Sequence, residues 1–240
     1  MDKKDEKKVI IELENVHKYY RMGENIVKAV NGVSLQIKEG EFVAILGPSG
    51  SGKSTMMNLI GSLDVPTKGK ILLDHQDIST LSESDLAQIR GKKIGFIFQS
   101  FNLINNLTAK ENVMLPMIFQ GYSVEERNHR ANKLMEMVEL SERMGHAPNE
   151  LSGGQQQRVA IARSLANSPE VILADEPTGN LDTKTGTNVM NFLQDLHKKG
   201  KTIVMVTHDV ELIDSYPDIV YWLRDGKIEK ITKRSKAGKG

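Results

Sequence analysis

The chain has 240 residues, of which 39% are hydrophobic and 26% are charged, and its formal net charge is +1. This composition is ordinary for a soluble globular protein with a sizeable core, and the near-neutral charge excludes a global field that would draw the chain to nucleic acid or to an anionic membrane. The absence of cysteine excludes disulfides, thiolate metal sites and a thiol nucleophile.

Both ends of the sequence are rich in charge. Residues 1–8 (MDKKDEKK) and 233–240 (KRSKAGKG) are typical of solvated, disordered tails. The charged start is not typical of a signal peptide, and no apolar run approaches the roughly 20 residues that a membrane-spanning helix needs. We therefore expect a cytoplasmic chain, so that any membrane part of its machinery must be another chain.

Short apolar runs predict strands along most of the chain. In chain order they are Val9–Val16, Ala29–Ile37, Glu41–Leu46, Lys70–Leu73, Lys93–Phe98, Val171–Ala174, Thr202–Val206 and Ile219–Leu223. Apolar residues at the helical spacing i, i+3, i+4, i+7 appear in 131–138 and 189–196, where they predict the core-facing sides of two helices.

The order of these elements predicts the organisation of the chain. Strands that alternate with helices after residue 41 favour a mostly parallel, covered sheet. The stretch from about residue 100 to 168 has helical signals only, with Thr108 and Glu111 as a candidate capping box. We expect one domain over residues 9–232 with a helical subdomain inserted at about 100–168.

The segment Gly47–Thr55, GPSGSGKST, matches the phosphate-binding pattern G-x-x-x-x-G-K-[ST] between an apolar strand and a helical segment. Glycines let backbone N–H groups point at phosphate oxygens, and the helix adds its positive end. Lys53 is expected to reach the β- and γ-phosphates, and Ser54 to reach Mg²⁺. The pattern alone does not choose among kinases, GTPases and transport ATPases. The candidate ATP-binding residues here are Gly47, Pro48, Ser49, Gly50, Ser51, Gly52, Lys53, Ser54 and Thr55.

Two carboxylates follow an apolar run in the segment VILADEP, residues 171–177. Ligands of open α/β sheets bind at the carboxyl ends of strands, so this position suits a catalytic pair. Asp175 fits the organisation of Mg²⁺ through water, and Glu176 fits the orientation and deprotonation of the attacking water. A strand that simply ends in a solvated polar turn is the alternative.

The segment LSGGQ, residues 151–155, opens a strong helical pattern and is a second candidate anion site. Taken alone, it is equally typical of a serine-capped helix without a ligand.

In this order, GPSGSGKST, LSGGQ, VILADEP and the later His208 resemble the full motif set of the ABC ATPases, over residues 9–232. The resemblance implies an α/β fold: a P-loop NTPase core with a mostly parallel sheet, an N-terminal antiparallel β part and an inserted helical subdomain. It implies hydrolysis of ATP with Mg²⁺ in a head-to-tail dimer. Each ATP would lie between GPSGSGKST of one chain and the partner's Ser152, Gly153, Gly154 and Gln155.

Further positions match the family pattern one by one. Tyr20 resembles the aromatic residue that stacks on adenine, Gln99 the glutamine that senses Mg²⁺ and the γ-phosphate, and His208 the switch histidine. The resemblance thus implies Glu176, His208 and Gln99 as catalytic residues, Ser54, Gln99 and Asp175 as the Mg²⁺ set, and Asn180, Leu181 and Asp182 as a loop at the dimer interface. A surface tyrosine and a structural histidine are the alternatives for Tyr20 and His208.

Several stretches are similar to one subgroup, whose ATPases work with MacB-type or FtsX-like membrane subunits. They include YRMGENIVKAV and DEPTGNLDTKTG. The resemblance implies that the membrane subunit docks on Phe101–Pro116, whose apolar Phe101, Leu103, Ile104 and Leu107 could equally be core.

Two other classes remain as hypotheses. One is a soluble ABC ATPase that acts on DNA or ribosomes, but the chain has neither a long coiled coil between its motifs nor a second cassette. The other is a small-molecule kinase, which would leave LSGGQ and His208 unexplained.

Overall fold

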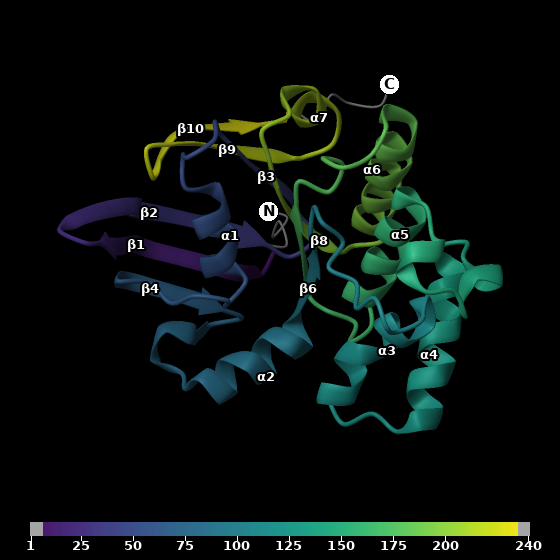
Figure 1. Cartoon of the computed structure of the whole chain (residues 1–240). Coiled ribbons are helices and arrows are strands. Elements are labelled where there is room, and N and C mark those ends of the chain that lie inside the picture. The colour runs from purple at the N-terminus through teal and green to yellow at the C-terminus, as the bar shows by residue number, and fades with distance from the viewer. Residues whose placement is uncertain (1–6, 235–240) are drawn as a thin grey trace, which may run out of the picture. The chain divides into compact units, whose positions relative to one another are not determined.

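The computed structural model describes residues 7–234. The chain divides into two compact units (Figure 1), which we call the strand-rich unit, residues 1–82 with 200–240, and the helix-rich unit, residues 83–199. The helix-rich unit is wider than the predicted helical subdomain, because two strands and the helices next to them belong to it.

An antiparallel sheet forms the first part of the strand-rich unit, as predicted. Its strand order is β2-β1-β4-β5, and its strands are β1 (Val9–Met22), β2 (Asn25–Lys38), β4 (Lys68–Leu73) and β5 (Gln76–Asp77). Strands β1 and β2 form a hairpin that extends beyond the predicted apolar runs, with Met22 opposite Asn25. This extension is exposed, so backbone pairing rather than burial maintains it.

A second group of strands in the same unit has the order β10-β9-β3-β8. The strands are β3 (Phe42–Leu46), β8 (Thr202–Thr207), β9 (Ile219–Arg224) and β10 (Lys227–Lys233). Strand β3 pairs in parallel with β8 and β9, and every residue of β3 and β8 is buried. Such burial explains the continuous apolar runs FVAIL and TIVMV. The remaining elements are α1 (Lys53–Ile60), α7 (Val210–Ser215) and a short 3₁₀ helix at Ile78–Thr80.

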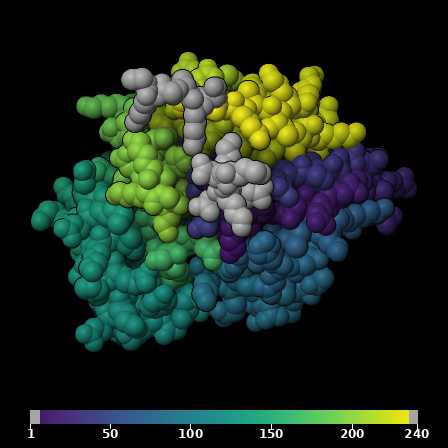
Figure 2. Space-filling model, turned by 180° about the vertical axis from the view of Figure 1, so that it is seen from behind, coloured from purple at the N-terminus to yellow at the C-terminus, as the bar shows by residue number. Residues whose placement is uncertain are grey.

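Strand β10 has no apolar run in the sequence, because its residues KIEKITK are mostly exposed. It pairs antiparallel with β9 through its backbone ladder, to which the Trp222 Nε1 bond to Thr232 Oγ1 at 2.8 Å is added, and it ends at Lys233, a residue expected to belong to a disordered tail. The space-filling view shows that these C-terminal strands adjoin the purple N-terminal strands (Figure 2), and the N–H of Asn31 on β2 donates to the Gly226 carbonyl at 2.8 Å.

At the other end of the chain, Lys7 Nζ donates to the Gly40 carbonyl at 3.0 Å, and Lys8 forms an ion pair with Asp74. The rest of the two predicted tails, residues 1–6 and 235–240, lies outside the described residues.

The helix-rich unit contains the parallel pair β6 (Ile94–Ile97) and β7 (Val171–Asp175), with Ile97 opposite Ala174. Its helices are α2 (Glu83–Lys93), α3 (Ala109–Phe119), α4 (Val124–Met137), α5 (Gly153–Ser164) and α6 (Thr183–Lys198), with short 3₁₀ helices at Ser141–Arg143 and Pro148–Glu150. In Figure 1, α3, α4 and α5 lie together. From β6 to β7 the described chain has no strand, as predicted.

The helical patterns of the sequence are confirmed with one exception. All four predicted core residues of 131–138 are buried, as are Val189, Leu193 and Leu196, but Phe192 is only half-buried. Thr108 and Glu111 form the predicted capping box at the start of α3. None of the helices in residues 7–234 is both long and apolar enough to cross a membrane.

Candidate functional site

The phosphate loop lies between the end of β3 and the start of α1, and two of its glycines are required by close backbone contacts. Gly52 has φ = 100°, and a Cβ atom there would lie 2.2 Å from the Ala29 carbonyl oxygen. A Cβ atom on Gly47 would lie 2.2 Å from the Leu223 carbonyl oxygen. Neighbouring strands thus hold the loop so tightly that no other residue fits at these two positions.

The loop concentrates hydrogen-bond donors around one charged side chain. Lys53 is only 8% exposed, and its Nζ donates to the Pro48 carbonyl of the same loop at 2.9 Å. The first intrahelical bond of α1 runs from Met56 N–H to the Gly52 carbonyl, so the preceding N–H groups lie in the unpaired first turn. Ser51 Oγ is buried without a hydrogen-bond partner among the described residues. This set of donors suits a phosphate.

Tyr20 lies near the exposed end of β1 and is anchored to the region that follows α1. Its Oη donates to Asp64 Oδ2 at 2.9 Å, and the Thr55 side chain at the end of the phosphate loop is close enough to act on the phenol. Burial raises the pKa of the Tyr20 phenol, and the bond to Asp64 raises it further. The Tyr20 residue is 37% exposed, so part of its surface is available to a ligand.

His208 follows β8 directly. Because Thr207 pairs with Leu46 on the parallel strand β3, His208 and Gly47 leave the sheet at the same edge. The phosphate loop, Tyr20 and His208 thus all belong to the strand-rich unit, and Gly47 and His208 follow paired strand ends.

In the helix-rich unit, β7 ends at Asp175, and Glu176 begins a tight turn. Glu176 has φ = 44°, a left-handed conformation that is uncommon for a residue with a side chain. The turn is closed by the N–H of Gly179, which donates to the Glu176 carbonyl at 3.0 Å. Non-glycine residues elsewhere in the described chain, such as Asn15 and Ser62, also have positive φ, so the backbone conformation alone assigns no role to Glu176.

Gln99 lies beside this turn and the loop that follows it. The Asn180 side-chain amide donates to the Gln99 carbonyl at 2.9 Å, and a Cβ atom on Gly179 would lie 2.7 Å from Gln99 Nε2, so the Gln99 side chain packs directly on this glycine. Asp182 caps α6 by accepting the Thr185 N–H at 3.0 Å. The structure thus places Gln99 next to the predicted interface loop.

The LSGGQ segment starts α5 with a complete capping box. Ser152 Oγ accepts from Gln155 N–H at 3.3 Å, and Gln155 Oε1 accepts from Ser152 N–H at 2.9 Å. The serine-capped helix that the sequence left as an alternative is therefore present. Such a cap does not exclude an anion site, because the glycines after Ser152 carry no side chain that would shield the helix start.

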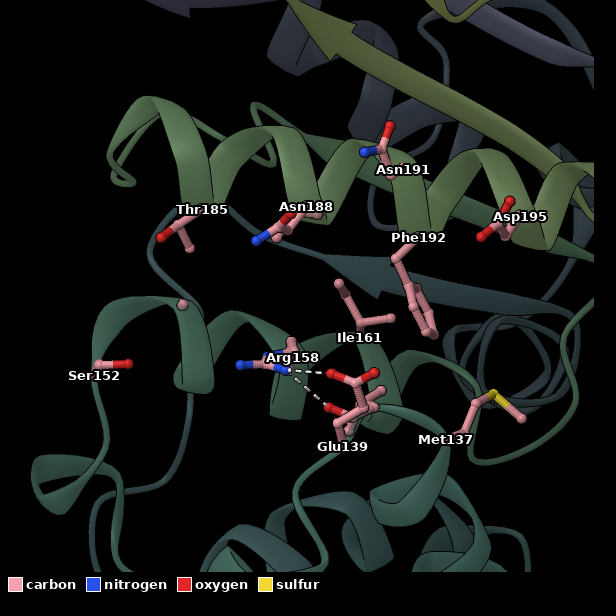
Figure 3. A pocket seen from close by; sticks show the side chains of 13 residues that line it. Met137, Glu139, Ser152, Arg158, Ile161, Thr185, Asn188, Asn191, Phe192 and Asp195 are labelled. Atoms are coloured by element: carbon pink, nitrogen blue, oxygen red, sulfur yellow. Dashed lines mark hydrogen bonds and ion pairs between the residues drawn. The ribbon is translucent and has the colours of Figure 1, made fainter.

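A pocket of about 410 Å³ lies next to this helix start, between α5 and α6 (Figure 3). Ser152 and Gly154 contribute to its lining. Within it, Arg158 Nη1 pairs with Glu139 Oε2 at 3.2 Å, and the half-buried Phe192 points into the pocket.

Three residues that sequence reasoning missed anchor the loops of the helix-rich unit. The guanidinium of Arg163 donates to the carbonyls of Phe101 and Asn102, just after Gln99, and burial lowers its pKa. Gln157 Nε2 donates to the Pro177 carbonyl at 2.6 Å, and Asn112 Nδ2 to three carbonyls between Ile104 and Thr108. No local sequence pattern identifies them, because each bonds a backbone group that the fold brings to it.

Comparisons with known proteins agree with this geometry. A family model described as ABC transporter matches residues 30–179. An uncharacterized ABC transporter ATP-binding protein of Thermotoga maritima is 55% identical over 227 residues, which is 95% of this chain and 97% of that protein. The macrolide export ATP-binding/permease protein MacB of Chlorobaculum tepidum is 49% identical over 95% of this chain, which spans only 35% of that protein.

A solved dimeric structure of the ATP-binding cassette MJ0796, bound to ADP and Pi, superposes with a TM-score of 0.86 at 52% identity and covers 94% of this chain and 99% of that chain. The fold and the phosphate loop thus define an ATP-binding-cassette ATPase. With the family model and these relatives, the chain belongs to the ABC transporter family.

Proposed function

We propose that the chain is the ATP-hydrolysing subunit of a membrane machine that exports a molecule or performs mechanical work, and that it acts by closing as a head-to-tail dimer on two ATP molecules. The observation on which this rests is the phosphate loop, where the buried Lys53 and the donors at the start of α1 belong to a loop that leaves no space for a side chain at Gly47 or Gly52.

The loop supplies the charge that a triphosphate requires. The Lys53 ammonium lies against the Pro48 carbonyl and can turn to a phosphate oxygen without leaving the loop. Backbone N–H groups at the start of α1 and the positive helix end add to this attraction. Tyr20 presents its exposed ring to the adenine base.

Glu176 is the proposed general base, with Gln99 and His208 as the residues that respond to the γ-phosphate. The turn from Glu176 to Gly179 fixes the carboxylate just after the end of β7. A general base of this kind contributes about 10²–10⁴ to the rate.

The donors proposed for Mg²⁺ are the Ser54 hydroxyl, the Gln99 amide oxygen and, through water, the Asp175 carboxylate. These are hard oxygen groups, which is the donor chemistry that Mg²⁺ prefers together with substrate phosphates. Mg²⁺, when bound, would neutralise charge that develops on the phosphates.

The partner chain is proposed to complete each ATP site with its LSGGQ segment. The MJ0796 cassette, similar in fold and sequence, forms dimers in solved structures. Closure then depends on the γ-phosphate, because without it the partner's α5 helix start has no anion to bind. Hydrolysis removes that anion and lets the dimer open.

A membrane subunit of the MacB or FtsX type is the proposed partner, which would place the chain at the inner face of the cell membrane. MacB, named an ATP-binding/permease protein, carries a region similar to this chain within a longer protein. In the segment Phe101–Pro116, Ile104 is exposed and Phe101, Leu103 and Leu107 are only half-buried. Apolar side chains left in this state suit a docking surface better than a core.

The experiment that tests the proposal uses Glu176→Gln. Without the general base this variant should bind ATP, hydrolyse it about 10²–10⁴-fold more slowly and accumulate as a closed dimer. Light scattering in solution should show a dimer with Mg²⁺ and ATP and a monomer with ADP. The wild-type chain is the control for turnover. A Glu176→Gln monomer that hydrolyses ATP rapidly would refute the assignment.

A soluble ABC ATPase that acts on DNA or ribosomes is not favoured, because the similar proteins named above are transporter cassettes and MacB. The small-molecule kinase hypothesis fails on the same ground.

A further inference from the structure

A bonded cluster near the exposed end of β1 joins Tyr20 to Asp64 and Lys18, two residues that none of the sequence motifs includes. Asp64, in the connection between α1 and β4, accepts from Tyr20 Oη at 2.9 Å and from Lys18 Nζ at 2.6 Å. Lys18 Nζ also donates to the Val65 carbonyl at 2.9 Å. The side chains of Lys18 and Tyr20 lie on the same side of the strand, because both bond the Asp64 carboxylate.

The donor and acceptor roles in this cluster are fixed at neutral pH. Burial acts to raise the pKa of Asp64, but the hydrogen bonds from Lys18, Tyr20 and the Val65 N–H outweigh it and hold the pKa below its usual value. Asp64 therefore stays ionised as an acceptor. Because the pKa of the Tyr20 phenol is raised, Tyr20 stays protonated as a donor.

The cluster also distinguishes the two faces of the Tyr20 ring. The Lys18 ammonium lies over the ring, 5.3 Å from its centroid, so one face is occupied by a cation. The Thr55 side chain is close enough to act on the same phenol, so the ring lies beside the helix that begins in the phosphate loop. The remaining face is the one that a base can cover.

We infer that Asp64 is a positioning residue for nucleotide binding: together with Lys18 it fixes the Tyr20 ring beside the phosphate loop, with one face preorganised to stack on the base. The inference rests on the proposed function, in which Tyr20 stacks on adenine. An unanchored tyrosine on an exposed hairpin would lose side-chain freedom on binding, and the anchor removes that cost beforehand.

The test compares ATP with inorganic tripolyphosphate, which has phosphates but no base, by isothermal titration of the full chain. Asp64→Ala and Tyr20→Phe each remove the anchoring hydrogen bond, and Tyr20→Phe keeps the ring. Both should weaken ATP binding about three- to ten-fold and leave tripolyphosphate binding unchanged. The double variant should bind ATP as well as either single variant, because both changes remove the same bond.

Asp195→Ala is the matched control. It breaks an exposed ion pair with Lys198 at 3.0 Å in α6 and should change neither affinity. Lys53→Ala should weaken the binding of both ATP and tripolyphosphate.

Three results would overturn the inference. If Asp64→Ala and Tyr20→Phe bind ATP normally while Lys53→Ala does not, the inference is wrong and the proposed function stands. If Asp64→Ala weakens the binding of ATP and of tripolyphosphate equally, Asp64 stabilises the phosphate loop and does not position the tyrosine for the base. If the wild-type chain binds no ATP, the proposed function fails and takes the inference with it.

Discussion

At the scale of single residues, the phosphate loop depends on glycines for two different reasons. Gly52 combines φ = 100° with a carbonyl oxygen that would be 2.2 Å from a Cβ atom, whereas Gly50 has φ = 79° with open space around it. Gly145 has neither constraint. The three positions separate the cost of backbone strain from the cost of a steric clash.

Alanine at these positions should produce graded losses of stability. Gly145→Ala should leave the free energy of unfolding nearly unchanged, Gly50→Ala should lower it by about 1–2 kcal/mol, and Gly52→Ala by about 3 kcal/mol or more. Urea unfolding followed by circular dichroism measures all three. Equal losses of unfolding free energy for Gly50→Ala and Gly52→Ala would show that the Ala29 carbonyl moves away to make room for the new methyl group.

The left-handed backbone of Glu176 is another effect at the scale of a single residue. Its left-handed backbone would be relaxed by glycine, but the proposed base would then be lost.

At the scale of elements, helices α4 and α5 provide a natural comparison because both begin with a serine capping box. Ser123 and Glu126 form the box at α4, with bonds of 2.8 and 3.2 Å. Ser152 and Gln155 form the box at α5, with bonds of 2.9 and 3.3 Å. Their stabilising effect should be similar, while only the second is proposed to meet ATP.

Ser123→Ala and Ser152→Ala should each cost about 1 kcal/mol of stability, because each removes one N-cap bond. Only Ser152→Ala should also reduce ATP-driven dimer formation in the Glu176→Gln background. Thermal unfolding and light scattering measure the two effects separately. Equal dimer formation by both variants would mean that Ser152 is a cap and nothing more.

The motifs of the helix-rich unit are also tied to one another through backbone carbonyls. Arg163 of α5 bonds the segment after Gln99, Gln157 of α5 bonds the turn after Glu176, and Asn180 bonds Gln99 itself. The helix that begins with LSGGQ is thereby connected to both predicted catalytic loops of this unit.

At the scale of the whole molecule, several carboxylates are held in their ionised form by local donors. The pKa of Glu111 is lowered by the Thr108 backbone, that of Glu126 by the Ser123 backbone and that of Asp182 by the Thr185 side chain. In Asp64, the bonds from Lys18 and Tyr20 exceed the opposing effect of burial.

These lowered pKa values make the protein sensitive to acid. The unfolded chain binds protons at these groups at a higher pH than the folded chain does, so their stabilising effect is complete above about pH 5 and is lost as the pH falls through the folded pKa values. Urea midpoints should therefore be similar at pH 7 and 6 and fall progressively from pH 4 to 3. A midpoint that is constant from pH 5 to 3 would contradict this.

The sequence by itself determined the features that depend on local chemistry. Glycines and a lysine at fixed spacing define a phosphate loop, apolar runs define the buried strands β3, β7 and β8, and serine or threonine followed by glutamate or glutamine defines the capping boxes. Each of these signals is complete within about ten residues, which is why it can be read from the chain.

Only the tertiary structure decided the features that depend on groups distant in sequence. Strand β10 and the end of the β1–β2 hairpin have no apolar pattern, because backbone pairing holds them at the surface. The bond between Tyr20 and Asp64 spans 44 residues, and the bond between Arg163 and Phe101 spans 62. A side chain that bonds a partner so far away needs no particular neighbours in the sequence, so no local pattern records it.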